Sequence, residues 1–186
     1  LIEDQIGILA IDNIAGFDRY STRHYSQRAH QFSNITALAS LTFPFALLLD
    51  KPNRNHTGEI LLITMEGALI NAGLINFTKT LVRRPRPFVY NGEAPLELKL
   101  RQEARYSFFS GHTAVSSYFT FAGAQMYNDI YPDSPHKGTV WATAAVLPLL
   151  TGYGRMRAGK HFLSDVLVGY GVGALLGVIV PRLHRL

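Results

Sequence analysis

Five long stretches almost free of charged side chains dominate this 186-residue sequence. They cover residues 31–49, 60–78, 113–128, 138–154 and 166–181, and together they hold one of the chain's 31 formal charges, that of Glu66. As helices they would each reach ~24–29 Å, close to the ~30 Å hydrocarbon core of a bilayer. Soluble helices of this length normally carry a charged outer stripe. The pattern therefore predicts an all-α helical bundle with about five long apolar helices that span a membrane.

A large soluble bundle stays the alternative, because the stretches contain uncharged polar side chains and the mean hydropathy is only +0.08. Asn71 and Asn76 lie in the second stretch, and Ser116 and Gln125 lie in the third. A carboxylate inside an apolar run is a functional candidate in a membrane. We interpret Glu66 instead as a residue of the bundle interior that pairs with a neighbouring polar group.

The length suits a single domain spanning residues 1–186. Residues 1–30 mix apolar and charged side chains, so we expect an N-terminal amphipathic helix that lies on the surface of the bundle. Residues 31–186 would form the helical core. No repeat, low-complexity tract or strand pattern interrupts this organisation.

The composition excludes some kinds of site and favours one kind of partner. The chain has no cysteine, which excludes a disulfide framework, thiolate metal sites and a cysteine nucleophile. The net charge is +5, which favours an anionic partner. The basic residues gather in loops beside apolar runs and form no recognition stripe, so we expect no nucleic-acid partner.

Helix alternation brings two basic connections together. If successive helices run up and down, the second and fourth end on the side where the third and fifth begin. The connections at residues 79–112 and 155–165 then face each other at one end of the bundle. This holds in a membrane and in water.

These two connections contain the parts of an anion site. His161 and Asp165 are four residues apart, so on a helix they could hydrogen-bond, which would leave one imidazole nitrogen free as a nucleophile or base. Ser110-Gly111 precedes a helix and offers a hydroxyl and unpaired backbone N–H groups. Arginines supply forks that match phosphate oxygens. Chemistry alone predicts an anion site with a nucleophile–base pair.

The same residues resemble the signature of the type 2 phosphatidic acid phosphatase superfamily, which also contains bacterial acid phosphatases and vanadium haloperoxidases. Its three blocks fit this sequence, in order, at Lys79 with Arg86-Pro87, at Ser110-Gly111-His112, and at Arg155, His161 and Asp165. Phe109 stands where the family usually has proline, and Gly154 where it usually has serine. Both departures fall at supporting positions, so they question local loop geometry and leave the reaction unchanged.

The resemblance implies hydrolysis of a phosphomonoester through a phosphohistidine, with no metal or other cofactor. Carried over residue by residue, His161 would be the nucleophile and Asp165 would orient it. His112 would protonate the leaving group and then activate water. The oxygens of the phosphate would be held by Lys79, Arg86, Ser110, Gly111 and Arg155.

Under this resemblance the substrate would be a phospholipid or isoprenoid phosphate, such as phosphatidic acid, phosphatidylglycerol phosphate, lipid A or an undecaprenyl carrier. The lipid bilayer would be the other partner, with no obligate protein partner evident, and the site would face the periplasm or the outside of a bacterial inner membrane. Three alternatives stay open: a soluble periplasmic acid phosphatase, a vanadium haloperoxidase, and a non-enzymatic membrane protein that binds anionic headgroups.

Two further expectations concern the surroundings of the site. The cations outside the signature are interpreted as rim charges that attract an anionic substrate; they are Arg83, Arg84, Arg157 and Lys160. The segment from Phe88 to Phe108 is long enough for a lid, and its Leu96, Leu98 and Leu100 could touch acyl chains.

Overall fold

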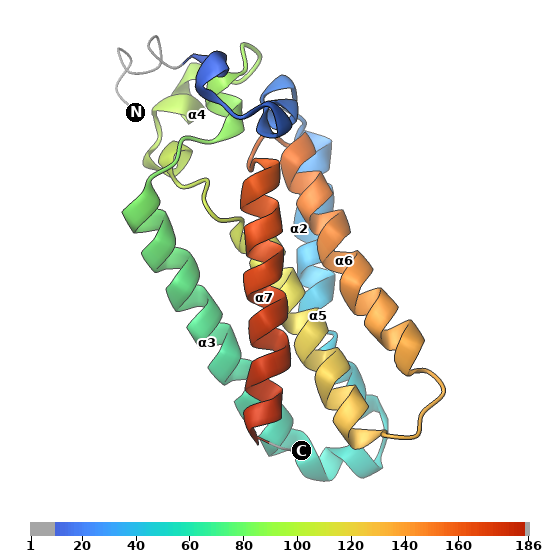
Figure 1. Ribbon diagram of the computed structural model, residues 1–186. Coiled ribbons are helices and arrows are strands. Elements are labelled where there is room, and N and C mark those ends of the chain that lie inside the picture. The colour runs from blue at the N-terminus through green and yellow to red at the C-terminus, as the bar shows by residue number, and fades with distance from the viewer. Residues whose placement is uncertain (1–9, 185–186) are drawn as a thin grey trace.

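The computed structural model describes residues 10–184, and within them every regular element is a helix (Figure 1). The long helices are α2 (Gln27–Leu41), α3 (Thr57–Val82), α5 (Gly111–Ile130), α6 (Lys137–Arg157) and α7 (Leu163–His184). Each of them covers most of one charge-poor stretch, because such stretches contain few helix breakers. The predicted all-α bundle is confirmed.

Short helices fill the connections. They are η1 (Ile11–Asn13), η2 (Gly16–Arg23), η3 (Pro44–Leu49), η4 (Pro52–His56), η5 (Pro87–Tyr90), α4 (Leu96–Leu100) and η6 (Gln102–Arg105). Of the predicted N-terminal amphipathic segment, residues 1–9 lie outside the described residues. The remainder is two 3-10 helices ahead of α2, and not one continuous helix. The second of these, η2, lies on the surface as expected, because Phe17 and Tyr20 are exposed, but the face that it buries carries the polar residues Asp18, Ser21 and Thr22.

Helix α5 is the centre of the bundle and packs against the four other long helices. Its closest neighbour is α7, which presents glycines at four-residue intervals. A Cβ atom at Gly169, Gly173 or Gly177 would lie only 2.2–2.7 Å from a backbone oxygen of α5 or of Ser110, which caps it. Small residues at this spacing let two helix backbones touch. The contact brings the first residues of α5 beside the first residues of α7.

Polar side chains of the charge-poor stretches point into the bundle. Ser40 Oγ and Ser116 Oγ lie 2.6 Å apart between α2 and α5, and Thr151 Oγ1 of α6 donates to Thr36 Oγ1 at 2.9 Å. Large apolar side chains, such as Leu69 of α3, are exposed instead. This arrangement explains why the mean hydropathy is low although the outer surface is apolar.

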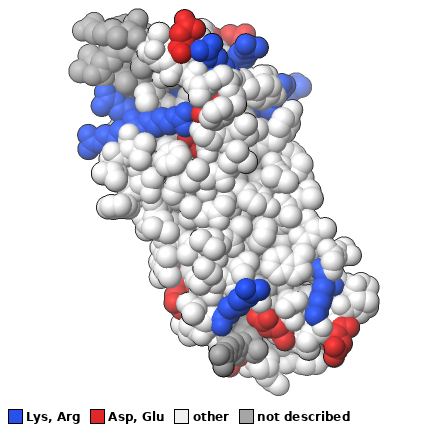
Figure 2. Space-filling model, in the orientation of Figure 1, with Lys and Arg blue, Asp and Glu red and all other residues white. Residues whose placement is uncertain are grey.

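On the face shown in Figure 2, charged side chains gather at the two ends of the molecule and leave an uncharged band between them. Two helical segments are long and apolar enough to cross a bilayer, Pro52–Tyr90 and Leu163–His184. Helices α2, α5 and α6 are less apolar because they contain serine and threonine side chains. These side chains form hydrogen bonds to one another inside the bundle. The structure thus supports the expected membrane character most strongly for α3 and α7.

The long helices run alternately up and down, as predicted (Figure 1). At the end where α3 and α6 finish and α7 begins, residues 10–26 and 83–110 cover the bundle; we call these two segments the cap. An apolar cluster holds the cap together, formed by Phe88, Val89, Ala94 and Ala104 with Tyr25 packed against it. The cap thus contains most of the first basic connection and packs against the second, since Asp18 of the cap accepts from Ser164 and Phe88 donates its N–H to the Gly159 oxygen.

Glu66 pairs with a neighbour, but it is not an interior residue. Its Oε2 atom lies 2.6 Å from Nε2 of His184, at the end of α7, and 43% of its side chain is exposed. The predicted pairing is confirmed and the predicted interior location is wrong. The reason is that α7 ends beside α3 at this height, so the partner comes from the surface of the bundle.

Candidate active site

Hydrogen bonds join the two basic connections directly. The backbone N–H of Ser110 donates to the backbone oxygen of Asp165 at 3.0 Å, and Nδ1 of His161 donates to the backbone oxygen of Ser107 at 2.7 Å. The prediction that these connections meet at one end of the bundle is confirmed. The close packing of α5 on α7 makes this possible, because both contacts lie where those helices begin.

His161 is buried, with 1% of its surface exposed, in the short turn between α6 and α7. A backbone carbonyl can only accept, so the bond to Ser107 places the ring proton on Nδ1. Nε2 then carries the lone pair, and it bonds to no other side chain or backbone group between residues 10 and 184. Burial, together with the charges of Arg86 and Arg155, holds the pKa of His161 well below its usual 6.5. The ring is therefore neutral at pH 7, as a nucleophile must be.

Asp165 lies beside His161 without hydrogen-bonding to it. Its Oδ2 atom is 3.8 Å from Nδ1, an ion-pair distance that is too long for a hydrogen bond. Oδ2 instead accepts from Ser107 Oγ at 2.5 Å and from the N–H of Phe162 at 2.9 Å. The expected His161–Asp165 hydrogen bond is absent because these donors occupy the carboxylate. Asp165 thus ties the residue that follows His161 to Ser107, whose backbone oxygen accepts from the His161 ring.

Three signature cations surround the same space. Lys79 is in the last turn of α3, Arg86 follows in the connection, and Arg155 is in the last turn of α6. The charges of Arg86 and Arg155 act on Lys79, and the charge of Arg86 acts on Arg155. The Nε atoms of Arg86 and Arg155 are buried, and neither has a hydrogen-bond partner within the part of the chain that the structure describes. These buried donors are available to an anion.

His112 belongs to the same cluster. It lies in the first turn of α5 and feels the charges of Arg155, Lys79 and Arg86. Its ring makes no hydrogen bond to any residue from 10 to 184. His112 and His161 thus both keep a ring nitrogen free near the cations.

Ser110 and Gly111 form the start of α5. The Ser110 hydroxyl caps the helix, since its Oγ accepts from the N–H of Thr113 at 3.4 Å and lies 2.8 Å from Thr113 Oγ1. A Cβ atom at Gly111 would lie 3.2 Å from Nζ of Lys79. The lysine ammonium therefore sits next to the helix N-terminus, where both favour negative charge.

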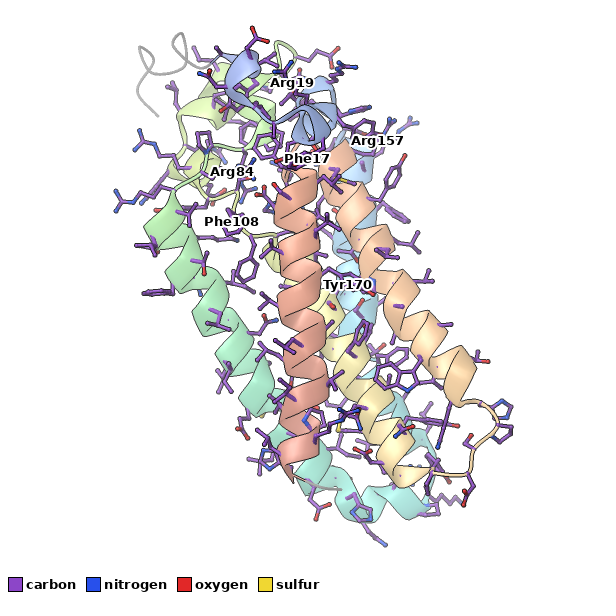
Figure 3. All side chains as sticks on the ribbon, in the orientation of Figure 1. Phe17, Arg19, Arg84, Phe108, Arg157 and Tyr170 are labelled. Atoms are coloured by element: carbon purple, nitrogen blue, oxygen red, sulfur yellow. The ribbon has the colours of Figure 1, made fainter. Side chains whose placement is uncertain are left out.

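Arg84 is not a rim charge, contrary to the sequence-based interpretation. Its Nη1 atom donates to Asp165 Oδ1 at 2.6 Å, and its guanidinium lies 4.1 Å from the centre of the Phe162 ring. Its Nη2 atom donates to Asp18 Oδ2 at 2.8 Å. Figure 3 shows Arg84 at the cap end of the bundle. Of the other expected rim cations, Arg83 is exposed and Arg157 donates to His24 at 2.8 Å.

The sequence analysis did not identify three residues that lie outside the family signature and bond to residues of the site. Asp18 binds Arg84, and His30 of α2 accepts from Arg155 Nη1 at 2.9 Å. Ser107 holds both His161 and Asp165. The spacing of these residues carries no local pattern, because each acts across more than 50 residues of sequence.

Both departures from the family signature have a packing reason. A Cβ atom at Gly154 would lie 2.9 Å from Cβ of Ser33 and 3.3 Å from the backbone oxygen of Ala29. Glycine thus lets α2 approach α6 closely enough for His30 to reach Arg155. Phe109, in place of proline, is buried in an apolar cluster that includes Ile75.

An apolar groove leads from the site between α2 and α3. Both helices pack on α5, and the space of about 370 Å³ left between them reaches His112 and Gly111. Its other lining residues are mostly apolar; they are Asn34, Ala37, Leu38, Leu41, Ala72, Ile75, Asn76 and Val115. The leucines expected to touch acyl chains do not line it. Leu98 packs inside the cap, whereas Leu96 and Leu100 are exposed on its surface.

Comparison with known proteins identifies the family. The sequence model of the PAP2 superfamily matches residues 60–186, more than half of the chain. The chain belongs to the PAP2 superfamily. The match includes all three signature blocks, so the resemblance inferred from them is confirmed. Among residues 10–184, no group of three or more acidic or histidine side chains is arranged to hold a metal ion.

Curated relatives are bacterial phosphatases. The chain is 34% identical over 88 residues to phosphatidylglycerophosphatase B of Bacillus subtilis, which covers 44% of this chain and 40% of that protein. It is 28% identical over 155 residues to lipid A 4'-phosphatase of Porphyromonas gingivalis, which covers 79% of this chain and 60% of that protein. The chain thus spans about half the length of these relatives.

Two crystal structures share the fold. Aquifex aeolicus LpxE superposes with a TM-score of 0.60 at 24% identity, over 94% of this chain and 99% of that one. The transmembrane PAP2-type phosphatidylglycerolphosphate phosphatase of Bacillus subtilis superposes with a TM-score of 0.54 at 23% identity, over 97% and 83%. These likenesses show the fold of this chain, and within it α3 and α7 have the length and apolar composition of membrane-spanning helices.

Proposed function

We propose that this chain is a metal-independent phosphatase that hydrolyses a lipid phosphate or diphosphate through a phosphohistidine on His161. One observation carries the proposal: the apolar groove ends at His112, where the signature cations and the neutral His161 converge. A phosphate could occupy the cationic end while an acyl or isoprenoid chain lies in the groove. A site for a small soluble ester would need no such groove.

In the first step, Nε2 of His161 would form a bond to phosphorus while the bond to the leaving oxygen breaks. His112 would give its proton to that oxygen. An anionic substrate offsets the cations around His112 and so favours its protonated form. In the second step, His112 would take a proton from water, the hydroxide would attack phosphorus, and the N–P bond would break. Inorganic phosphate leaves and both histidines are restored.

Cations would supply most of the catalysis, because phosphoryl transfer depends mainly on positioning and charge neutralisation. Lys79, Arg86 and Arg155 would hold the equatorial oxygens, and the buried Nε donors of the two arginines support this assignment. The Gly111 amide would add a donor at the start of α5, with Ser110 shaping that turn. Asp165 would keep His161 in place.

The relatives and the groove together support a lipid as the substrate. The named relatives act on phosphatidylglycerophosphate and lipid A, both of which carry a phosphate on an acylated lipid. We propose phosphatidic acid, phosphatidylglycerol phosphate, lipid A or undecaprenyl diphosphate as candidates. We further propose a bacterial inner-membrane location with the cap and the site facing the periplasm.

Phosphate release from phosphatidic acid and from a small soluble ester tests the proposal, with detergent and chelator present in both assays. We expect chelator-resistant turnover of the lipid that His161→Ala abolishes. Turnover of the small ester alone would favour a soluble-type acid phosphatase and contradict the lipid assignment. Vanadate-dependent halide oxidation in place of hydrolysis would show a haloperoxidase. Headgroup binding that survives His161→Ala, with no turnover of any candidate lipid, would indicate a non-enzymatic protein.

A further inference from the structure

Asp18 is a buried carboxylate that the reaction described above does not use. It lies in η2 of the cap with 2% of its surface exposed. Its Oδ1 atom accepts from the N–H of Ser164 at 2.9 Å, and Oδ2 accepts from Ser164 Oγ at 2.6 Å and from Arg84 Nη2 at 2.8 Å. Both oxygens are therefore occupied by the first residues of α7 and by Arg84.

Arg84 connects Asp18 to Asp165 of the candidate site. Its Nη1 atom donates to Asp165 Oδ1 at 2.6 Å and to Ser164 Oγ at 2.7 Å. The guanidinium is thus fixed between two carboxylates, with the ring of Phe162 on one face. A guanidinium fork held at both ends has little freedom to rotate.

Asp165 in turn holds the two backbone segments that meet at the nucleophile. It accepts from Ser107 Oγ and from the N–H of Phe162, the residue after His161. The backbone oxygen of Ser107 accepts from Nδ1 of His161. A continuous chain of contacts therefore runs from Asp18 through Arg84, Asp165 and Ser107 to His161.

Asp18 lies far from the other residues of this chain of contacts in the sequence. The family match covers residues 60–186, so Asp18 lies in the part of the chain that the family model does not describe. It reaches Arg84 across 66 residues and Ser164 across 146. Without Asp18, the half-buried Arg84 would keep Asp165 as its one carboxylate partner and could turn toward the phosphate.

We propose that Asp18 is a positioning residue, which fixes Arg84 and Ser164 so that Asp165 holds the His161 turn in the geometry of attack. The inference rests on the proposed function, since it assigns Asp18 to the reaction at that site. Loss of such positioning slows the chemical step, and small misplacements cost up to ~100-fold in rate.

Single-turnover hydrolysis of radiolabelled phosphatidic acid, with enzyme in saturating excess in detergent, tests the role. Under these conditions misfolded molecules do not lower the rate constant as long as active enzyme still exceeds substrate. We expect Asp18→Asn to lower the rate constant ~10–100-fold, and Asp18→Glu, which keeps the charge, to lose less. Asp12→Asn is the matched control, because Asp12 lies in the same cap segment with 92% of its side chain exposed. It should retain the wild-type rate constant.

Two results separate this inference from the proposed function. If His161→Ala is inactive but Asp18→Asn turns over within twofold of wild type, the role of Asp18 is overturned and the proposed function stands. If the wild-type chain hydrolyses no candidate lipid, the proposed function fails and the inference fails with it. Should Asp18→Asn not fold, Ser164→Ala replaces it, since it removes one hydroxyl between Asp18 and Arg84. A rate constant equal to wild type would then overturn the inference.

Discussion

Nδ1 of His161 donates a hydrogen bond to the backbone oxygen of Ser107 at 2.7 Å. The bond fixes the tautomer of the ring and leaves Nε2 as the atom that can attack phosphorus. A backbone acceptor cannot change its protonation state, so the Ser107 oxygen accepts this hydrogen bond at every pH. A carboxylate partner would lose this role when it is protonated.

The first prediction concerns the pH dependence of the reaction. Because the pKa of His161 lies well below 6.5, the ring stays neutral as the pH falls through 6.5. We expect the acid limb of kcat/KM to lie below pH 6.5 after correction for the ionisation of the substrate. The measurement is a pH–rate profile with a soluble phosphate ester. An acid limb at or above pH 6.5 would contradict a nucleophile that is neutral in the free enzyme.

The same shift predicts how stability depends on pH. In the unfolded chain His161 binds a proton near pH 6.5, whereas in the folded chain it does so only at lower pH. The unfolded state thus binds more protons below pH 6.5, and the free energy of unfolding falls as the pH drops through that range. Thermal unfolding in detergent at pH 5 and pH 7 measures this. His161→Gln should lose less stability between the two pH values than wild type does.

Lys160 should contribute to the alkaline limb of substrate binding. Burial, together with the charges of Arg86 and Arg155, lowers the pKa of Lys160 to about 8. Above that pH the side chain loses its charge and attracts an anionic substrate less strongly. Arginine stays charged throughout this range, so we expect Lys160→Arg to gain in kcat/KM relative to wild type between pH 7 and pH 9. An unchanged ratio across that range would show that another group controls the limb.

Glycines of α7 offer a matched test of the bundle. A Cβ atom at Gly173 would lie 2.2 Å from the backbone oxygen of Ala114, whereas one at Gly171 meets nothing within 4 Å. We expect Gly173→Ala to destabilise the protein by about 1–3 kcal/mol through overpacking. Gly171→Ala should be neutral or stabilise by up to about 1 kcal/mol, since alanine favours helix. Thermal unfolding of both variants in detergent gives the comparison, and equal melting temperatures would argue against direct α5–α7 backbone contact.

The groove can be tested by filling it. Ala72 lines the groove, whereas Ala39 is exposed on α2 outside it. Ala72→Phe should lower kcat/KM for phosphatidic acid about tenfold, the effect of losing about 1.4 kcal/mol of binding, and should spare a small soluble ester. Ala39→Phe should leave both substrates unaffected. If Ala72→Phe slows both substrates equally, the groove is not where the lipid chain binds.

Much of this architecture could be predicted from the sequence, because charged side chains are excluded from long apolar helices and therefore mark where those helices end. The five charge-poor stretches located the long helices, and alternation brought His112 and His161 to one end. The helices and their alternation depend on residue type and order alone, whereas the resemblance to the family signature pointed to Lys79, Arg86 and Arg155 as the cations of the site.

The supports of the site could not be predicted in the same way. Asp18 sits in a segment whose pattern indicated a surface helix, and its burial depends on a partner 66 residues away. Arg84 was interpreted as a rim charge because only the fold shows that Asp165 accepts from it. His161 bonds to Ser107 and not to Asp165 because the Ser107 oxygen lies 2.7 Å from Nδ1 and the Asp165 oxygen 3.8 Å. The four-residue spacing of His161 and Asp165 does not predict this difference.

The central claim is that His161 carries the phosphoryl group, and trapping the intermediate tests it most directly. Wild type, His161→Ala and His112→Ala would be mixed with a ³²P-labelled aryl phosphate, quenched in alkaline detergent because phosphohistidine is acid-labile, and assayed for label on the protein. Loss of His112 should slow hydrolysis of the intermediate more than its formation with an aryl leaving group, which needs little help from an acid. We therefore expect label on wild type, more label on His112→Ala and none on His161→Ala. Label that persists on His161→Ala, or turnover by that variant at the wild-type rate, would contradict the account.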